Sequence, residues 1–155
     1  MVAAVEPAFD VRMMEAALSE AAACLEFGDV PVGAVVARDD QILAAAGNGR
    51  ERLQDPTAHA EVLVLRAASA AVGSWRLDGC AMYVTLEPCA LCAGAIVLAR
   101  LDRLIFGASD PKAGFVGSLR NLAQDDRLNH RVEVGGGLME RECGDILRAF
   151  FSERR

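Results

Sequence analysis

Hydrophobic residues recur along the first third of the chain with two different spacings. The first run follows helical spacing, with apolar side chains at Val11, Met14, Leu18, Ala21 and Leu25. This spacing predicts a helix over about 10–27, and Gly28 is placed to end it. The short apolar runs at 32–37 and 42–47 flank the polar segment 38–41, which predicts two strands joined as a β-hairpin.

Helical and strand patterns alternate through the rest of the chain. A second helix is expected over about 58–72, ending at Gly73. The other predicted elements are, in order, a strand at 80–85, a helix at 88–99 opened by Pro88, a strand at 103–107, a loop at 108–118, a short helix at 119–125, a strand at 131–134, a glycine-rich break at 135–137 and a last helix at 138–151. Strands separated by helices favour parallel pairing, so we expect an α/β fold, a three-layer α-β-α sandwich around a five-stranded mixed sheet.

Length and composition fit one globular domain over residues 1–155. Hydrophobic residues make up 53% and charged residues 25%, and a chain of 155 residues can bury a core without disulfides. The opening segment MVAAVEPAFDVR lacks a basic region followed by an apolar core, so no secretory signal is expected. No apolar run approaches the roughly 18 to 20 residues of a membrane span. We therefore expect a cytoplasmic protein that does not associate with a membrane.

The net charge of −6 is unevenly distributed along the chain. Residues 1–99 carry 6 basic and 13 acidic side chains, a balance of −7, whereas residues 100–155 carry 10 and 9, a balance of +1. Two interpretations stay open for the later half, a mixed solvated surface or a local phosphate-facing patch. The basic residues available for such a patch are Arg103, Lys112, Arg120, Arg127, Arg131, Arg148, Arg154 and Arg155.

Two cysteines three residues apart stand out in a chain with five cysteines and two histidines. Cys89 and Cys92 occupy positions i and i+3 of the predicted helix, so both sulfur atoms can reach one point near its start. The positive end of the helix dipole favours thiolates there, and thiolates are ligands for zinc. A redox-active C-x-x-C pair is the alternative. Such pairs normally follow the first strand of a thioredoxin-like unit, whereas this one lies mid-chain behind Glu87 and Pro88.

His59 and Glu61 complete a candidate metal centre. His59 lies at the predicted start of the helix over 58–72, and Glu61 follows two residues later. Together with Cys89 and Cys92 they resemble the H-x-E…P-C-x-x-C signature of zinc-dependent nucleobase deaminases. Each residue alone has a simpler interpretation as a helix cap, a core residue or a partner of the helix dipole. The combination favours a zinc site.

The number of ligands distinguishes a structural zinc from a catalytic one. A structural site needs four protein ligands, whereas a catalytic site has three and leaves the fourth position to water. The other candidate ligands lack metal-binding spacing: Cys24, Cys80, Cys143 and His130. A His-Cys-Cys site with Glu61 as the proton carrier is therefore favoured. Zinc lowers the pKa of bound water from about 15.7 toward about 7. Glu61 would accept the released proton, pass it to a ring nitrogen of the base, and later protonate the departing ammonia.

Nearly the whole chain resembles the cytidine/deoxycytidylate deaminase superfamily and, within it, the bacterial tRNA-specific adenosine deaminases. The matching segments are DVPVGAVV, GNGRERLQDPTAHAEVLVLRAA, YVTLEPCALCAGAIVLARLDRLIFGASDPKAGFVGSL, LNHRVEV and FFSERR. The resemblance implies a cytidine deaminase-like fold, one Zn²⁺ per subunit held by His59, Cys89 and Cys92, and Glu61 as the proton shuttle. It also implies a homodimer that acts on a tRNA anticodon stem-loop.

The resemblance further implies a set of substrate-contacting residues, Asn48, Pro31, Val32, Ala60, Asp110 and Lys112. Asn48 can both donate and accept hydrogen bonds, as reading a purine edge requires, although Asn before Gly is also typical of a turn. Pro31 and Val32 would line the pocket. Asp110 and Lys112 would lie on the loop that meets the nucleotides flanking the target.

Three functions stay open at this point. The first is zinc-dependent hydrolytic deamination of adenosine to inosine at the wobble position of a tRNA anticodon loop. The second is the same chemistry on a free base or nucleoside of the guanine or cytosine type. The third is a non-catalytic RNA-binding module with a structural zinc, which requires a fourth protein ligand such as His130 or Cys80.

Overall fold

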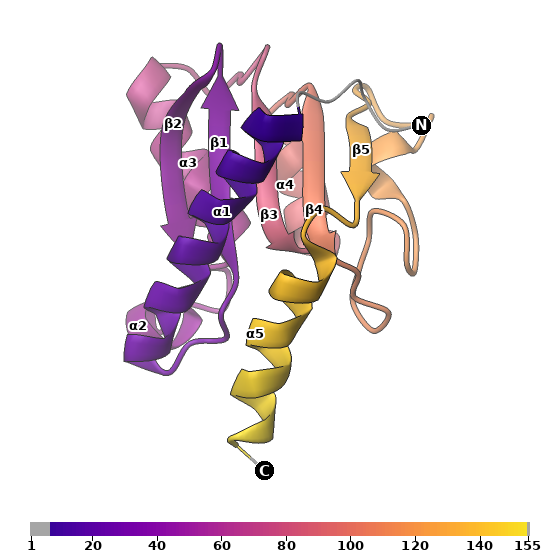
Figure 1. Cartoon of the computed structure of the whole chain (residues 1–155). Coiled ribbons are helices and arrows are strands. Elements are labelled where there is room, and N and C mark those ends of the chain that lie inside the picture. The colour runs from indigo at the N-terminus through magenta and orange to yellow at the C-terminus, as the bar shows by residue number, and fades with distance from the viewer. Residues whose placement is uncertain (1–6, 155) are drawn as a thin grey trace.

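The computed structural model describes residues 7–154 as one sheet with helices on both of its faces (Figure 1). Helices α1 (Pro7–Ala23) and α5 (Glu140–Ser152) lie in front of the sheet in this view. Helices α3 (Ala60–Val72) and α4 (Ala90–Leu98) lie behind it. The predicted three-layer α-β-α sandwich is confirmed.

The sheet contains five strands in the order β2-β1-β3-β4-β5. Their bounds are β1 (Gly33–Arg38), β2 (Gln41–Gly47), β3 (Ala81–Leu86), β4 (Arg103–Ala108) and β5 (Glu133–Gly136). Strand β1 pairs antiparallel with β2 and β3, whereas β3, β4 and β5 run parallel, as the intervening helices predicted. The carboxyl ends of β3 and β4 therefore meet at one edge of the sheet, where ligands of open α/β sheets commonly bind.

The β1–β2 hairpin closes through a two-residue turn at Asp39 and Asp40. Both residues have positive φ, 51° and 62°, which are the left-handed conformations that a type I′ turn requires. Asp tolerates this conformation better than most residues because its short side chain can hydrogen-bond locally. The hairpin predicted around residues 38–41 is confirmed.

Alternating side chains of the central strands fill two separate cores. Val36 and Met82 belong to the core between the sheet and the α3–α4 layer. Their sequence neighbours Val35 and Tyr83 point to the opposite face and pack with Met14 of α1. Because both faces of the strands are buried, their sequences are apolar throughout rather than alternating.

Several helix ends differ from the prediction. Helix α1 begins at Pro7 and not near residue 10, and α3 begins at Ala60 and not near residue 58. Helix α4 begins at Ala90, not at Pro88, because Cys89 has an extended backbone (φ −76°, ψ −179°) and is the N-cap residue. The first helix ends in a 3-10 turn, Cys24–Phe27, before Gly28 adopts the predicted left-handed conformation (φ 74°).

The region around β5 was partly mispredicted. The strand lies at Glu133–Gly136, two residues later than expected, so the glycine-rich break at 135–137 is wrong. Gly136 pairs with Phe106 of β4, and a Cβ atom at Gly136 would lie 2.4 Å from the phenyl ring. Glycine is therefore present so that the ring can cross the strand, not to end it. The helix expected at 119–125 is only a 3-10 turn, Leu122–Gln124.

A short helix, α2 (Arg50–Leu53), was not predicted from the sequence. Its first amide groups are held by Asp29, whose carboxylate accepts hydrogen bonds from the N–H of Glu51 (2.6 Å) and of Arg52 (3.2 Å). Asp29 is buried, so the segment that precedes β1 is tied to the loop that follows β2. A four-residue helix that depends on a distant carboxylate leaves no periodic signal in the sequence.

Two predictions fall partly or wholly outside the described residues. The segment in which no secretory signal was expected includes residues 1–6, and the proposed basic patch includes Arg155. Among the helices of residues 7–154, none combines the length and apolar character needed to cross a bilayer.

Candidate active site

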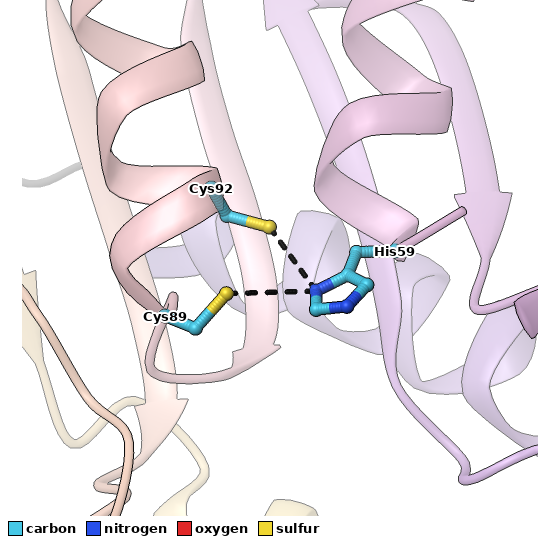
Figure 2. A group of neighbouring side chains, drawn as sticks. All are labelled: His59, Cys89 and Cys92. Atoms are coloured by element: carbon cyan, nitrogen blue, oxygen red, sulfur yellow. Dashed lines mark hydrogen bonds between the residues drawn. The ribbon is translucent and has the colours of Figure 1, made fainter. Parts of the chain in front are cut away.

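His59 and the two cysteines meet at the edge of the sheet where β3 ends (Figure 2). His59 is the N-cap residue of α3 and has an extended backbone (φ −72°, ψ 150°), and its side chain makes no capping bond. Its Nδ1 atom lies 3.6 Å from Cys89 Sγ and 3.4 Å from Cys92 Sγ. Residues that are thirty positions apart in sequence therefore converge on one point.

The connection between β3 and α4 presents both sulfur atoms to the imidazole ring. Cys89 is the N-cap residue of α4 and is half-buried, and Cys92 lies in the first turn and is fully buried. Positions i and i+3 of a helix start lie on the same side, as expected for these two cysteines. Figure 2 shows both Sγ atoms directed from this turn toward Nδ1 of His59.

The three side chains fit a tetrahedral zinc ion. Their ligand atoms all lie within 4.8 Å of one another. Zinc bonds of about 2.3 Å to sulfur and 2.0–2.1 Å to nitrogen, meeting at the tetrahedral angle, separate the two atoms by roughly 3.6 Å. The observed sulfur–nitrogen distances of 3.4 and 3.6 Å match this value. Soft thiolates with an imidazole are a donor set typical of zinc.

Within residues 7–154, the group of clustered potential ligands has three members and no fourth. Cys80 precedes β3, whereas the cluster follows the other end of that strand, and its sulfur lies beside the carbonyl of Asp78. The Nε2 atom of His130 lies 2.6 Å from the carbonyl oxygen of Leu101. Neither candidate for a fourth ligand is near the site, which argues against the structural-zinc interpretation.

Of the two cysteines, Cys89 is prepared to bind a cation, whereas Cys92 must first lose its proton. Hydrogen bonding from Cys92, supported by His59 and opposed by burial, lowers the pKa of Cys89 to about 4. Hydrogen bonding to Cys89 in turn raises the pKa of His59 and of Cys92, and burial adds to the rise at Cys92. Cys89 is therefore a thiolate at neutral pH, and the binding of a metal would displace protons from the cluster.

Glu61 lies in the first turn of α3, two residues after His59, and only 4% of its surface is exposed. Burial is the main cause that raises its pKa to about 7. A carboxyl group with a pKa near the working pH can both accept and return a proton. Glu61 is not a member of the metal cluster but lines the same cavity, as a proton carrier requires.

His59, Glu61 and Cys89 line a cavity of about 270 Å³. Its walls are formed by Val30, Val32, Asn48, Arg50, His59, Ala60, Glu61, Leu86, Glu87, Cys89, Asp110, Ala113 and Phe151. The volume lies just below the range of roughly 300–1,000 Å³ that is typical of small-molecule pockets. The cavity is therefore large enough for one small planar group and not for a long ligand.

Most of the residues expected to contact substrate line this cavity, with two exceptions. Val32, Asn48, Ala60 and Asp110 are wall residues. Pro31 is buried but, among the described residues, is not part of the wall. Val30 and Val32, on either side of Pro31, are wall residues, and the N–H of Val32 donates to the carbonyl of Val30 (2.9 Å), which closes a tight turn at Pro31.

Lys112 and Asn48 are placed differently with respect to the cavity. Lys112 lies in a neighbouring groove and not in the cavity. Asn48 does line the cavity, but its side-chain amide donates to the carbonyl of Val30 (3.1 Å) and accepts from the N–H of Arg50 (3.2 Å). Asn48 therefore holds the wall together and has one remaining donor and acceptor function for a ligand.

Several wall residues were missed in the sequence: Val30, Arg50, Leu86, Glu87, Ala113 and Phe151. Glu87 and Leu86 directly precede the Pro-Cys motif, so their proximity to the site could have been deduced. Phe151 comes from α5, the last helix, and its approach depends on how α5 packs against the sheet. No local pattern carries that information.

A larger groove of about 920 Å³ adjoins the cavity. The two share Val30, Leu86, Asp110, Ala113 and Phe151. The groove adds the basic side chains of Lys112, Arg148 and Arg154, all from the part of the chain with the positive balance. This arrangement favours the phosphate-facing interpretation of these three residues over a mixed solvated surface.

Comparison with known proteins agrees with this geometry. A model of the MafB19-like deaminase family matches residues 9–155. The tRNA-specific adenosine deaminase of Bacillus subtilis (strain 168) is 51% identical over 146 residues, which cover 94% of this chain and 91% of that protein. The chain belongs to the MafB19-like deaminase family.

Solved structures of other deaminases share the fold. One, described in studies of A-to-I editing by tRNA:A34 deaminases at the wobble position of transfer RNA, has a TM-score of 0.85 and 46% identity. The match covers 88% of this chain and 99% of that one. Guanine deaminase from Bacillus subtilis is more distant, with a TM-score of 0.60, 36% identity and 63% of both chains covered. The fold therefore serves deaminases of more than one purine.

Proposed function

We propose that this single deaminase domain, residues 1–155, hydrolyses adenosine to inosine at the wobble position of a tRNA anticodon loop, with one Zn²⁺ per subunit. The observation that carries the proposal is the group formed by His59, Cys89 and Cys92 beside Glu61, in a small cavity that opens into a basic groove. The 51% identical relative from Bacillus subtilis, named a tRNA-specific adenosine deaminase, supports the same substrate.

The residues of the cavity divide the chemistry among them. His59, Cys89 and Cys92 would hold zinc, which when bound supplies a Lewis acid that activates water for attack on the carbon bearing the exocyclic amine. Glu61 accepts one proton from the attacking water and delivers it to a ring nitrogen. It then takes the second proton, from the hydroxyl group left on the carbon, and delivers it to the amine, which leaves as ammonia. Apolar wall residues, the half-buried Val30 and the buried Val32, help to exclude bulk water from this exchange.

The volumes of the cavity and the groove fit a substrate base that belongs to a longer RNA. A cavity of about 270 Å³ accepts one base, and the groove of about 920 Å³ beside it can take the flanking nucleotides. Lys112, Arg148 and Arg154 supply positive charge along the groove, where phosphates would lie. An anticodon loop offers unstacked bases of this kind, and sequence-specific RNA recognition usually targets unstacked bases in loops.

The test is incubation of the zinc-loaded protein with an anticodon stem-loop that carries adenosine at the wobble position, beside free adenosine, cytidine and guanine. We expect inosine in the stem-loop, measured by mass spectrometry of the digested RNA, and no conversion after zinc is removed with a chelator. Conversion of a free base or nucleoside without any inosine in RNA would establish the alternative function instead. The similarity to guanine deaminase is the observation that keeps this alternative in view.

We also propose that the protein is a cytoplasmic homodimer, which follows from the resemblance to tRNA-modifying relatives. Exposed apolar side chains lie beside α3 and α4, with Trp75 61% and Leu98 70% exposed, and they border a hollow of about 470 Å³. A surface of this kind on a protein in water commonly marks an interface. Light scattering should give twice the mass of one chain, and Leu98→Arg should give a monomer. A monomeric wild-type protein would contradict the proposal.

A further inference from the structure

Glu87 is a buried carboxylate that the proposed chemistry does not use. It follows β3, directly precedes Pro88 and Cys89, and only 3% of its surface is exposed. Among the described residues it takes part in no ion pair. An ionised carboxylate in such a place needs several hydrogen-bond donors to offset its loss of water.

All of the groups that donate hydrogen bonds to the Glu87 carboxylate come from one stretch of the loop that follows β4. Its Oε1 atom accepts the N–H of Asp110 (3.0 Å) and the hydroxyl of Ser118 (2.5 Å), and Oε2 accepts the N–H of Val116 (3.2 Å) and of Ser118 (2.9 Å). The backbone adds a further bond, from the N–H of Phe115 to the carbonyl of Pro88 (2.8 Å). Residues 109–118, which we name the anchored loop, therefore wrap around a single side chain.

Gly114 shows how closely the anchored loop approaches Glu87. A Cβ atom at Gly114 would lie 2.2 to 2.4 Å from the carboxylate atoms of Glu87. Any side chain there would displace either the loop or the carboxylate. Glu87 therefore supplies the negative charge at this contact, and Gly114 leaves the space for it.

The anchored loop also forms part of the site. Asp110 and Ala113 line the cavity, and Lys112 lines the basic groove. The side chain of Asp110 accepts the N–H groups of Lys112 (3.1 Å) and Ala113 (3.2 Å), so fixing Asp110 fixes its neighbours. Glu87 thereby joins the substrate-facing loop to the start of α4, which carries Cys89 and Cys92.

We propose that Glu87 is a positioning residue that holds the anchored loop in register with the metal-binding turn, so that the loop can receive the nucleotides beside the target base. The part of this inference that concerns RNA rests on the proposed function. The part that concerns the loop does not, and the two are tested separately.

The first measurement is hydrogen exchange of the backbone amides, which needs no substrate. Glu87→Gln keeps the volume but replaces one acceptor oxygen with an NH₂ group that opposes two loop donors. We expect at least one of the amides that donate to Glu87, those of Asp110, Val116 and Ser118, to exchange at least about tenfold faster in this variant, while amides within α4 keep their protection. Unchanged exchange in the loop would overturn the anchoring role.

A second variant removes only one bond and leaves the charge. Ser118→Ala, at an exposed position, deletes the hydroxyl donor to Glu87, so folding should be retained and loop exchange should rise by a smaller factor. Ser74→Ala is the matched control, because it deletes a serine hydroxyl that accepts the N–H of Arg76 (3.0 Å) in the turn after the far end of α3. This control should leave exchange of the anchored loop unchanged.

The second measurement separates binding from chemistry with the anticodon stem-loop. Glu87→Gln should raise KM and the dissociation constant of a labelled stem-loop by about tenfold or more, with kcat within about threefold of the wild type and zinc still bound. A fall in kcat or in zinc content with KM unchanged would show that Glu87 supports the metal-binding turn instead, and would overturn the proposal. If the wild type forms no inosine, the proposed function fails, and the exchange measurement alone still decides whether Glu87 anchors the loop.

Discussion

Glu61→Gln is expected to lower turnover of the stem-loop by about 10³- to 10⁴-fold while one zinc ion per chain stays bound. The amide has the size of the carboxyl group but can neither accept the proton of the attacking water nor deliver one to the leaving amine. Since Glu61 is not a member of the His59, Cys89 and Cys92 cluster, the metal site should survive the substitution. The measurements are single-turnover kinetics and metal analysis of the same sample.

Cys92→Ala is the matched comparison for this prediction. It removes a fully buried ligand from the cluster, so zinc content and turnover should fall together. In Glu61→Gln only turnover should fall. Turnover of Glu61→Gln within about tenfold of the wild type would remove Glu61 from the role of proton carrier.

The stability of the metal-free proteins checks that Glu61→Gln is folded. Burial raises the pKa of Glu61 from its ordinary 4.5 to about 7, so the folded state holds this proton more tightly than the unfolded state. The stability that this group contributes is therefore fully present below about pH 4.5 and is lost as pH rises through about 7. Glutamine does not titrate, so the Glu61→Gln variant does not lose this stability as pH rises. Denaturant unfolding should show it to be more stable than the metal-free wild type at pH 8, with a smaller difference at pH 5.

The overall fold was predictable because each element carries a local signal that agrees with its neighbours. The helix that ends at Gly28 and the one that ends at Gly73 were recognised from apolar spacing and a left-handed glycine, and both glycines adopt that conformation. Strand β5 was misplaced because Gly136 serves a contact with Phe106 in another strand. A contact of this kind is set by register between distant segments, which local patterns do not encode.

The metal centre was predictable for a different reason. His59, Cys89 and Cys92 must each have a specific chemical identity to bind zinc, so the pattern is visible as residue types at fixed spacing. Glu87 lies within the same motif but gave no signal of its role, because three of its four hydrogen-bond donors are backbone N–H groups that any sequence supplies. Phe151 was missed because its position depends on the packing of α5.

A buried ion pair far from the metal site was also invisible in the sequence. Asp10 lies near the start of α1, where an acidic residue usually complements the helix dipole at the surface. In the structure it is fully buried. It accepts hydrogen bonds from the hydroxyl of Tyr83 (2.5 Å) and from Nη2 of Arg103 (2.8 Å). One carboxylate thus ties α1 to β3 and β4.

Asp10→Asn is expected to lower the free energy of unfolding by about 3 kcal/mol or more, the size found when one partner of a buried ion pair is removed. The amide keeps the shape and can still accept the Tyr83 hydroxyl, but it leaves the Arg103 guanidinium without its counter-charge, and only 16% of that side chain is exposed. The melting temperature should fall by roughly 6–12 °C. Thermal and urea unfolding of the zinc-loaded proteins measure both quantities.

Asp78→Asn provides the matched control, because Asp78 pairs with Arg76 at 3.1 Å with both side chains more than half exposed. Exposed pairs contribute about 0–1 kcal/mol, so this variant should unfold almost as the wild type does. If Asp10→Asn also costs less than about 1 kcal/mol, the buried pair does not stabilise the fold as argued. Combining Asp10→Leu, Arg103→Met and Tyr83→Phe tests the cause, since removing all three groups together leaves neither an unpaired charge nor an unpaired hydroxyl group to bury. That triple variant should unfold at a higher temperature than Asp10→Asn, because the loss comes from the stranded guanidinium and not from the missing contact itself.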